Sequence, residues 1–340
     1  MSSSSPTPDR KSCLTSRRLL GIACLVGVVV LWTASGRFIK WLLAQQDGDT
    51  PVFMTMYAQS HGVLMLLPLL WNKVNMRDLF KTFPKWKVVV FSLCWLACQM
   101  TYNISWSERL AGMRFSTQTI LSNSSSAFTF LIGFAIFREK FRVLSGLGVV
   151  AAIAGAYMIL MKQGQGGKDA KSEDSVTGIV LTVSSAAIGG FCSCLMNRWL
   201  VNEKHANTLF GLVGLVSLLL FPFVCVIAHY TGIESFQLPS ISHFGFYSVN
   251  AILGTVISNS LYSVAVTILG PLIVSVGTVT TVPVALAIDL MTGEYLVFSA
   301  FYVLGLILVV AAVCCVGIDQ TNAGKEKEKI NEIENPVKLV

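Results

Sequence analysis

Apolar residues dominate ten stretches of the chain, each about twenty residues long and separated by polar segments. A helix needs about 20 apolar residues to cross the hydrocarbon core of a bilayer, so each stretch predicts one transmembrane helix. The predicted spans cover residues 19–43, 51–71, 86–107, 113–137, 143–161, 176–200, 207–230, 243–268, 271–292 and 296–318. The predicted fold class is therefore an all-α polytopic membrane protein with about ten transmembrane helices.

Composition narrows the class of protein further. Of the 340 residues, 54% are hydrophobic and 13% are charged, and the mean hydropathy is +0.66. A soluble domain carries roughly 25% charged residues, so this chain cannot cover a water-facing surface. A cytosolic enzyme and a disordered protein are thereby excluded, no nucleic-acid partner is expected, and the surroundings are a lipid bilayer.

The positive charges favour one orientation, because the cytoplasmic segments of membrane proteins are enriched in Lys and Arg. With ten spans, 18 of the 25 Lys and Arg residues fall on the side that holds both termini, and 7 fall on the other side. Both termini are therefore expected in the cytosol, where residues 1–18 and 319–340 form polar, disordered tails. The first apolar run is longer than that of a usual signal peptide, so we expect a retained helix rather than a cleaved leader.

A Gly-rich, mixed-charge segment at residues 162–175 predicts a flexible linker in the middle of the chain. It separates residues 19–161 from residues 176–318, and each half contains five predicted helices. Because five is odd, the second half enters the membrane from the opposite side. The two halves then form an inverted-topology repeat, an architecture that many secondary transporters share.

Three matches between the halves support a duplication. They pair residues 40–43 with 198–201 at an offset of 158, and residues 137–139 with 292–294 and 122–126 with 277–281 at an offset of 155. Each match is short, but the three occur in order around the central linker.

Several motifs resemble those of one transporter family. They are Leu31-Trp32-Thr33-Ala34-Ser35, Thr101-Tyr102-Asn103, the polar stretch 119–129 and Thr280-Thr281-Val282-Pro283. With two five-helix halves, the chain resembles the drug/metabolite transporter superfamily, and within it solute carrier family 35 subfamily F and its fungal vacuolar relatives. This resemblance covers residues 17–318 and implies transport of a nucleotide sugar, a nucleotide-like solute or a vitamin-like solute. It also implies a Golgi, endosomal or vacuolar membrane, with the plasma membrane as the alternative.

Polar side chains follow one face of several predicted helices, because residues four apart share a helix face. In lipid, such groups are tolerated chiefly where they face other helices or a water-filled cavity. The candidate substrate-binding residues are His61, Gln99, Asn103, Gln118, Ser122, Ser125, Ser258, Asn259, Tyr262 and Thr281. This mixture of amide, hydroxyl and aromatic groups suits a polar organic solute that carries a ring or a sugar.

Each of these features has a structural alternative. The polar faces could hold helices together by interhelical hydrogen bonds. His61 could couple transport to protons, or it could be a neutral histidine bonded inside the bundle. Pro283 indicates either a packing kink or a local unwinding that faces the cavity. Small residues at every fourth position in 148–156 and 178–194 predict close helix packing, within the chain or in a homodimer.

The function expected from these features is alternating-access transport of a polar organic metabolite, without enzymatic activity. The sequence has no P-loop, so ATP is not expected to drive the protein directly. Its nine cysteines do not form a zinc-type quartet, so neither a metal nor another cofactor is expected. The alternatives are a non-transporting membrane scaffold or receptor, and a lipid-modifying membrane enzyme.

Overall fold

The computed structural model describes residues 10–44, 50–68, 84–107, 109–113, 115–136, 142–163, 175–199, 203–235, 239–269 and 277–291, and short pieces between 274 and 322. Within these ranges the regular elements are helices, and none is a strand. Among the described residues, five segments are long and apolar enough to cross a membrane: Ser16–Ala44, Lys85–Ile104, Val176–Met196, Asn207–Tyr230 and Ile241–Val266. The predicted all-α membrane fold is confirmed, whereas the ten spans and the inverted repeat stay predictions.

Each predicted span contains helical residues, but only some of the spans form one continuous helix. The continuous ones are α1 (Arg10–Ala44), α5 (Lys85–Ile104), α8 (Val143–Gln163), α9 (Val176–Trp199) and α10 (Glu203–Tyr230). The second, fourth, eighth and ninth spans are divided into α2 (Pro51–Ser60) and η1 (His61–Leu66), α6 (Phe115–Ser122) and α7 (Ser125–Ala135), α11 (Ile241–Asn250), η2 (Ala251–Ile257) and α12 (Ser258–Leu269), and η3 (Thr278–Thr280) and α14 (Thr281–Met291). The tenth span is described only by helical pieces between residues 300 and 319. Most of the predicted linker and of the predicted C-terminal tail lies outside the described residues. The predicted N-terminal tail differs, because its residues 10–18 are helical and belong to α1.

The break between α6 and α7 has a local cause. Ser122 Oγ donates to Thr119 O at 3.0 Å, and Ser124 Oγ donates to Leu121 O at 2.6 Å. Such bonds offer the backbone an alternative to the helical ladder, which is why hydroxyl-rich runs weaken helices. The polar run that marked the fourth span in the sequence is therefore the place where this helix is interrupted.

The ninth span has a similar interruption at η3, where Thr281 Oγ1 donates to Thr278 O at 2.6 Å. Because α14 begins at Thr281, Pro283 falls in the first turn of a helix. Proline costs little there, since the first amide groups of a helix have no intrahelical acceptor. The irregularity expected near this proline therefore lies one turn earlier in the chain.

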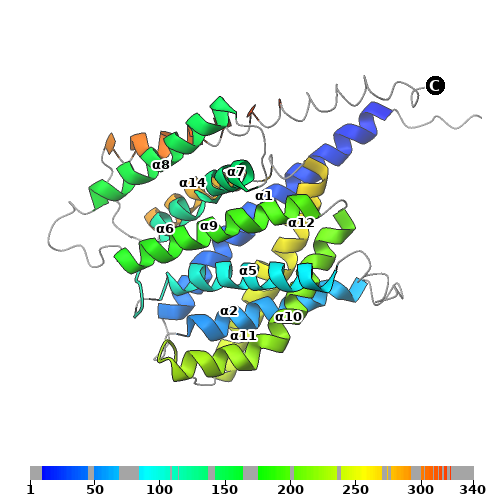
Figure 1. Ribbon diagram of the computed structural model, residues 1–340, viewed down its shortest axis with the longest axis vertical. Helices are drawn as coiled ribbons and strands as arrows, with labels where there is room; N and C mark the ends of the chain where they lie inside the picture. The colour runs from blue at the N-terminus through cyan, green and yellow to red at the C-terminus, as the bar shows by residue number, and fades with distance from the viewer. Residues whose placement is uncertain are drawn as a thin grey trace, which may run out of the picture.

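The helices pack as a bundle in which neighbours often come from different halves of the chain. Figure 1 shows α5 and α9 side by side, with α1 running beside α12, and these pairs are in extensive contact. Helix α10 packs on α2 and η1, α6 packs on α14, and α8 lies at the outer edge beside the pieces from residues 300–319. The bundle thus brings elements of the first half of the chain into contact with elements of the second half.

The small-residue stripe of the sixth span packs inside the chain. Its members Gly178, Thr182, Ala186, Gly190 and Cys194 are all buried. A Cβ atom at position 190 would lie 2.8 Å from a backbone nitrogen of α7, so only glycine permits this approach. This stripe is therefore a packing surface between α9 and the first half of the chain.

Candidate solute-binding cavity

A cavity of about 300 Å³ lies within the helix bundle. Its walls come from α1, α2, α5, α6, α7 and α9, and from the eighth and ninth spans. The volume is at the lower end of the range of about 300–1,000 Å³ that small-molecule sites occupy. The third, fourth, eighth and ninth spans, whose polar residues stood out in the sequence, all contribute to one cavity.

Seven of the ten candidate residues line this cavity, and the other three do not. The seven are Gln99, Asn103, Ser122, Ser125, Asn259, Tyr262 and Thr281. The three that lie elsewhere are His61, Gln118 and Ser258, and each has partners away from the cavity.

His61 begins η1, where its ring lies against Tyr57 with centroids 4.6 Å apart and its Nδ1 lies 2.9 Å from the carbonyl oxygen of Tyr57. Gln118 is fully buried and donates to Ser105 Oγ and to Tyr102 O, each at 2.9 Å. It therefore ties α6 to the turn that follows α5. Both side chains face helix contacts in this conformation.

Ser258 turns away from the cavity because of a backbone feature that spacing alone does not reveal. Residues 251–257 form a π-helical segment, whose wider turn rotates the residues that follow it. Asn259 and Tyr262 reach the cavity as a result, whereas Ser258 Oγ donates to Gly254 O at 2.5 Å. The regular four-residue stripe through Ser258 is thus broken at this point.

Several polar groups of the wall are held by bonds between helices. Asn103 Nδ2 donates to Thr55 Oγ1 at 2.8 Å, which joins α5 to α2. Ser35 Oγ donates to Asn250 Oδ1 at 2.8 Å, which joins α1 to the end of α11. These residues fix the shape of the cavity and present only part of their hydrogen-bonding capacity to it.

Other polar groups of the wall have no such partner. Within the described part of the chain, the side chains of Gln99, Asn259 and Tyr262 make no hydrogen bond, although each lines the cavity. Asn259 is only 6% exposed, so the surface that it leaves open faces the cavity. A solute in the cavity could therefore form hydrogen bonds that the protein itself leaves open.

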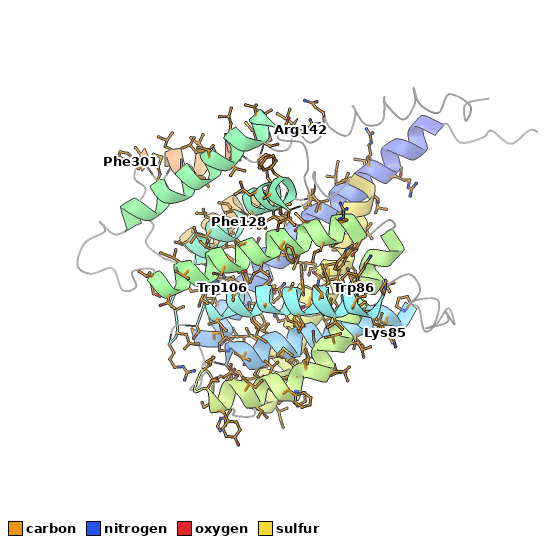
Figure 2. All side chains as sticks on the ribbon, in the orientation of Figure 1. Lys85, Trp86, Trp106, Phe128, Arg142 and Phe301 are labelled. Carbon is orange, nitrogen blue, oxygen red and sulfur yellow. The ribbon has the colours of Figure 1, made fainter. Side chains whose placement is uncertain are left out.

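Aromatic rings cover two sides of the same space. Trp32 of α1 lies against Tyr262 of α12, with ring centroids 5.3 Å apart. Tyr102 of α5 lies against Trp106 just beyond it, with centroids 4.7 Å apart. Figure 2 labels Trp106 at one end of α5 and Trp86 at the other. The rings and the amides therefore share the cavity wall.

Two tryptophans of the wall, Trp95 and Trp32, were missed among the candidates. Trp95 continues the stripe of Gln99 and Asn103 by one more turn and donates from Nε1 to Gln59 Oε1 at 3.1 Å. Extending that four-residue spacing would have identified Trp95. Trp32 carries no comparable signal, because a tryptophan in an apolar run is equally typical of a lipid-facing surface.

The described part of the wall is electrically neutral. Every residue that the structure places on it is uncharged at neutral pH. Among the described residues, no group of three or more His, Cys, Asp or Glu side chains is arranged to hold a metal ion. The arrangement can therefore bind a solute by hydrogen bonds and ring contacts.

A further buried carboxylate lies outside the cavity, in the loop between α10 and α11. Glu234 accepts from the backbone nitrogen of Val52 at 2.6 Å and from that of Phe53 at 3.1 Å, and it is 4% exposed. It thus satisfies free amides at the beginning of α2. A single Glu in a loop gives no sequence signal for this role.

Comparison with known proteins agrees with this architecture. Residues 19–161 match the EamA-like transporter family. The resemblance to the drug/metabolite transporters is thereby confirmed for the first half of the chain. A solved crystal structure shares the fold with a TM-score of 0.58 at 14% identity, covering 88% of this chain and 96% of the other.

Relatives across most of the chain are named as transporters, solute carriers or membrane proteins. An uncharacterised transporter of Schizosaccharomyces pombe is 28% identical over 90% of this chain and 97% of its own. Solute carrier family 35 member F3 of Homo sapiens is 22% identical over 85% of this chain and 70% of its own. An uncharacterised vacuolar membrane protein of Saccharomyces cerevisiae is 27% identical over 65% of this chain and 58% of its own. The resemblance to subfamily F and its fungal vacuolar relatives is confirmed.

Proposed function

We propose that this protein is a secondary transporter that moves a polar organic solute across an internal membrane by alternating access. The observation that carries the proposal is the cavity inside the helix bundle, to which both halves of the chain contribute polar residues. Transporters of this kind bind their solute between two repeats near the middle of the membrane. The transporter names of the relatives support the same function.

The helix contacts support the inverted repeat on which this mechanism depends. Under the repeat, α1 corresponds to α9, and α5 corresponds to the eighth span that ends in α12. A two-fold relation then requires that the packing of α1 on α12 be matched by the packing of α9 on α5, and both pairs are in extensive contact. Likewise, the packing of α9 on α7 is matched by that of α1 on α14.

Broken helices supply a second argument. The interruption at residues 123–124 and the one at η3 fall on positions that correspond in the proposed repeat. Asn123 Nδ2 donates to Thr281 Oγ1 at 3.2 Å, so the two interruptions meet at the cavity wall. Discontinuous helices that meet between repeats are typical of transporter binding sites, because their free backbone groups face the solute.

Uptake into proteoliposomes tests the proposal directly. The purified full-length chain is reconstituted, and radiolabelled nucleotide sugars, nucleosides, nucleotides and vitamins are supplied in turn. We expect saturable uptake of at least one solute, and faster uptake when the vesicles are preloaded with the same unlabelled solute. Preloading matters because only a carrier that alternates between two arrangements accelerates exchange in this way.

The two alternatives predict different outcomes. A scaffold or receptor would bind a solute without moving it, so the vesicles would match empty ones. A lipid-modifying enzyme would change the supplied compound or the lipids, which mass spectrometry of the vesicles would detect. Either result would replace the transporter assignment. Whether a homodimer forms, and which organelle holds the protein, are separate proposals for cross-linking and for imaging of a tagged chain.

A further inference from the structure

We infer that the cavity selects a planar heteroaromatic solute that carries no phosphate group. This inference rests on the proposed transport function and narrows its substrate class. The conclusion depends on three features of the wall, namely its unpaired polar groups, its aromatic rings and its neutrality. Each of them restricts the solute in a different way.

The unpaired polar groups come from two helices that correspond in the proposed repeat. Gln99 lies on α5, and Asn259 and Tyr262 lie on α12. A carboxamide offers both a donor and an acceptor, and a phenol can act as either. Together they match the edge of a heteroaromatic ring, on which donors and acceptors alternate. A saturated hydrocarbon would leave all three groups unpaired.

The rings restrict the shape of the solute. Trp32 and Tyr262 lie on one side of the cavity, and Tyr102 and Trp106 belong to another helix. Stacking on aromatic side chains favours flat solutes and tolerates different ring identities. The volume of about 300 Å³ is at the lower end of the range of about 300–1,000 Å³ for small-molecule sites, which favours one ring system with small substituents.

Neutrality of the wall restricts the charge. A phosphate moved into this cavity would lose its hydration without meeting a cationic side chain among the residues placed there. The effective penalty for each unpaired buried ion is several kcal/mol, which corresponds to at least about 100-fold weaker binding. The matched compound without the phosphate escapes this penalty. The cavity therefore separates a ring compound from its own phosphate ester.

Matched pairs of compounds test this selection on the full-length chain in lipid nanodiscs. Quenching of tryptophan fluorescence is titrated with two neutral nucleosides and their esters, namely uridine and its 5′-monophosphate, and adenosine and its 5′-monophosphate. We expect at least one unphosphorylated member to bind, with its phosphate ester at least about 100-fold weaker. The inference is overturned if no unphosphorylated member binds at about 10 mM, or if an ester binds as well as its parent.

A charge placed in the wall should change the selection. Gln99→Lys adds one cation at an unpaired position, and Gln99→Met is the matched uncharged control. We expect the lysine variant to narrow the gap between ester and parent compound by about tenfold or more, while the methionine variant leaves the gap unchanged. Gln99→Glu should widen the difference in affinity between ester and parent compound. This variant provides a second test if the lysine variant does not fold. The inference would be overturned if the difference in affinity between ester and parent compound were the same in the lysine and glutamate variants.

Uptake in the same preparation separates this inference from the proposed function. If phosphate esters are transported, the substrate class is wrong and the transporter assignment stands. If ring compounds bind with the expected selection but nothing is transported, the substrate class stands and the transporter assignment is wrong.

Discussion

Glu234 joins the two halves of the chain through the beginning of α2. Its carboxylate accepts two backbone N–H groups at a helix N-terminus, where negative charge is favourable. Charge-assisted bonds of this kind contribute about 1.5–3 kcal/mol each. We expect Glu234→Gln to lower the free energy of unfolding by about 2 kcal/mol, because the amide keeps one acceptor and loses the charge. Thermal unfolding followed by tryptophan fluorescence measures this, and Ser235→Ala in the same loop is the control. Equal melting temperatures for the two variants would show that the carboxylate does not hold α2.

Asn103 and Asn259 separate binding from packing, because both line the cavity and only Asn103 has a partner on another helix. We expect Asn259→Ala to weaken apparent solute affinity a few-fold, in keeping with about 0.5–1.5 kcal/mol for one hydrogen bond, with the melting temperature unchanged. Asn103→Ala should lower both, since it also breaks the bond to Thr55. Uptake and thermal unfolding are measured on both variants, with Ser260→Ala as the control. A loss of stability in Asn259→Ala would assign this residue to packing as well.

At the scale of elements, η1 and α10 approach each other too closely for a side chain at position 214. A Cβ atom at Gly214 would overlap the backbone nitrogen of Val63 and the backbone carbon of Gly62. Backbone atoms cannot rotate away as side chains do, so the two segments would have to separate. We expect Gly214→Ala to cost about 3 kcal/mol and to reduce the yield of folded protein. Gly245→Ala has open space around it and is the control. Normal stability of Gly214→Ala would mean that η1 and α10 are not held this closely.

Interruptions in the helices also explain where the four-residue spacing in the sequence predicted a shared helix face and where it did not. The four-residue spacing placed Gln99 and Asn103 on one face because α5 is a continuous α-helix. The same spacing was misleading at Ser258, because η2 changes the number of residues per turn just before it. Periodicity therefore predicts a shared face only as far as the regular helix extends.

At the scale of the whole molecule, carboxylates of the second half contact the beginnings of two helices of the first half. Glu234 holds the beginning of α2, and Asp319 Oδ2 accepts from Ser145 Oγ at 2.5 Å near the beginning of α8. In the proposed orientation, these two contacts lie on opposite sides of the membrane. Alternating access would then have to preserve or exchange them as the halves move.

That orientation is itself testable. We expect Gly166→Cys, within the central linker, to face the lumen, and Ala323→Cys, after the last span, to face the cytosol. In sealed vesicles with the cytosolic side outward, an impermeant maleimide should label position 323 at once and position 166 only after permeabilisation. Cys13, Cys314 and Cys315 are replaced by Ser in both variants to remove background labelling. Labelling of position 166 in sealed vesicles would contradict the ten-helix topology.

The sequence by itself determined the helical class and the positions of the apolar segments. This follows from a local rule, since a backbone in lipid must satisfy its own hydrogen bonds and the helix does so within one segment. It also indicated seven of the residues that line the cavity, because a polar side chain within an apolar run has few places to lie other than the bundle interior.

Only the tertiary structure decided which of these residues meet and which are left unpaired. Gln118 found a partner in Ser105, beyond the end of α5, whereas Gln99 and Asn259 found none among the described residues. Glu234 reached the beginning of α2 from a position more than 180 residues away. Such outcomes depend on contacts between distant segments, and the local pattern of apolar and polar residues carries no information about them.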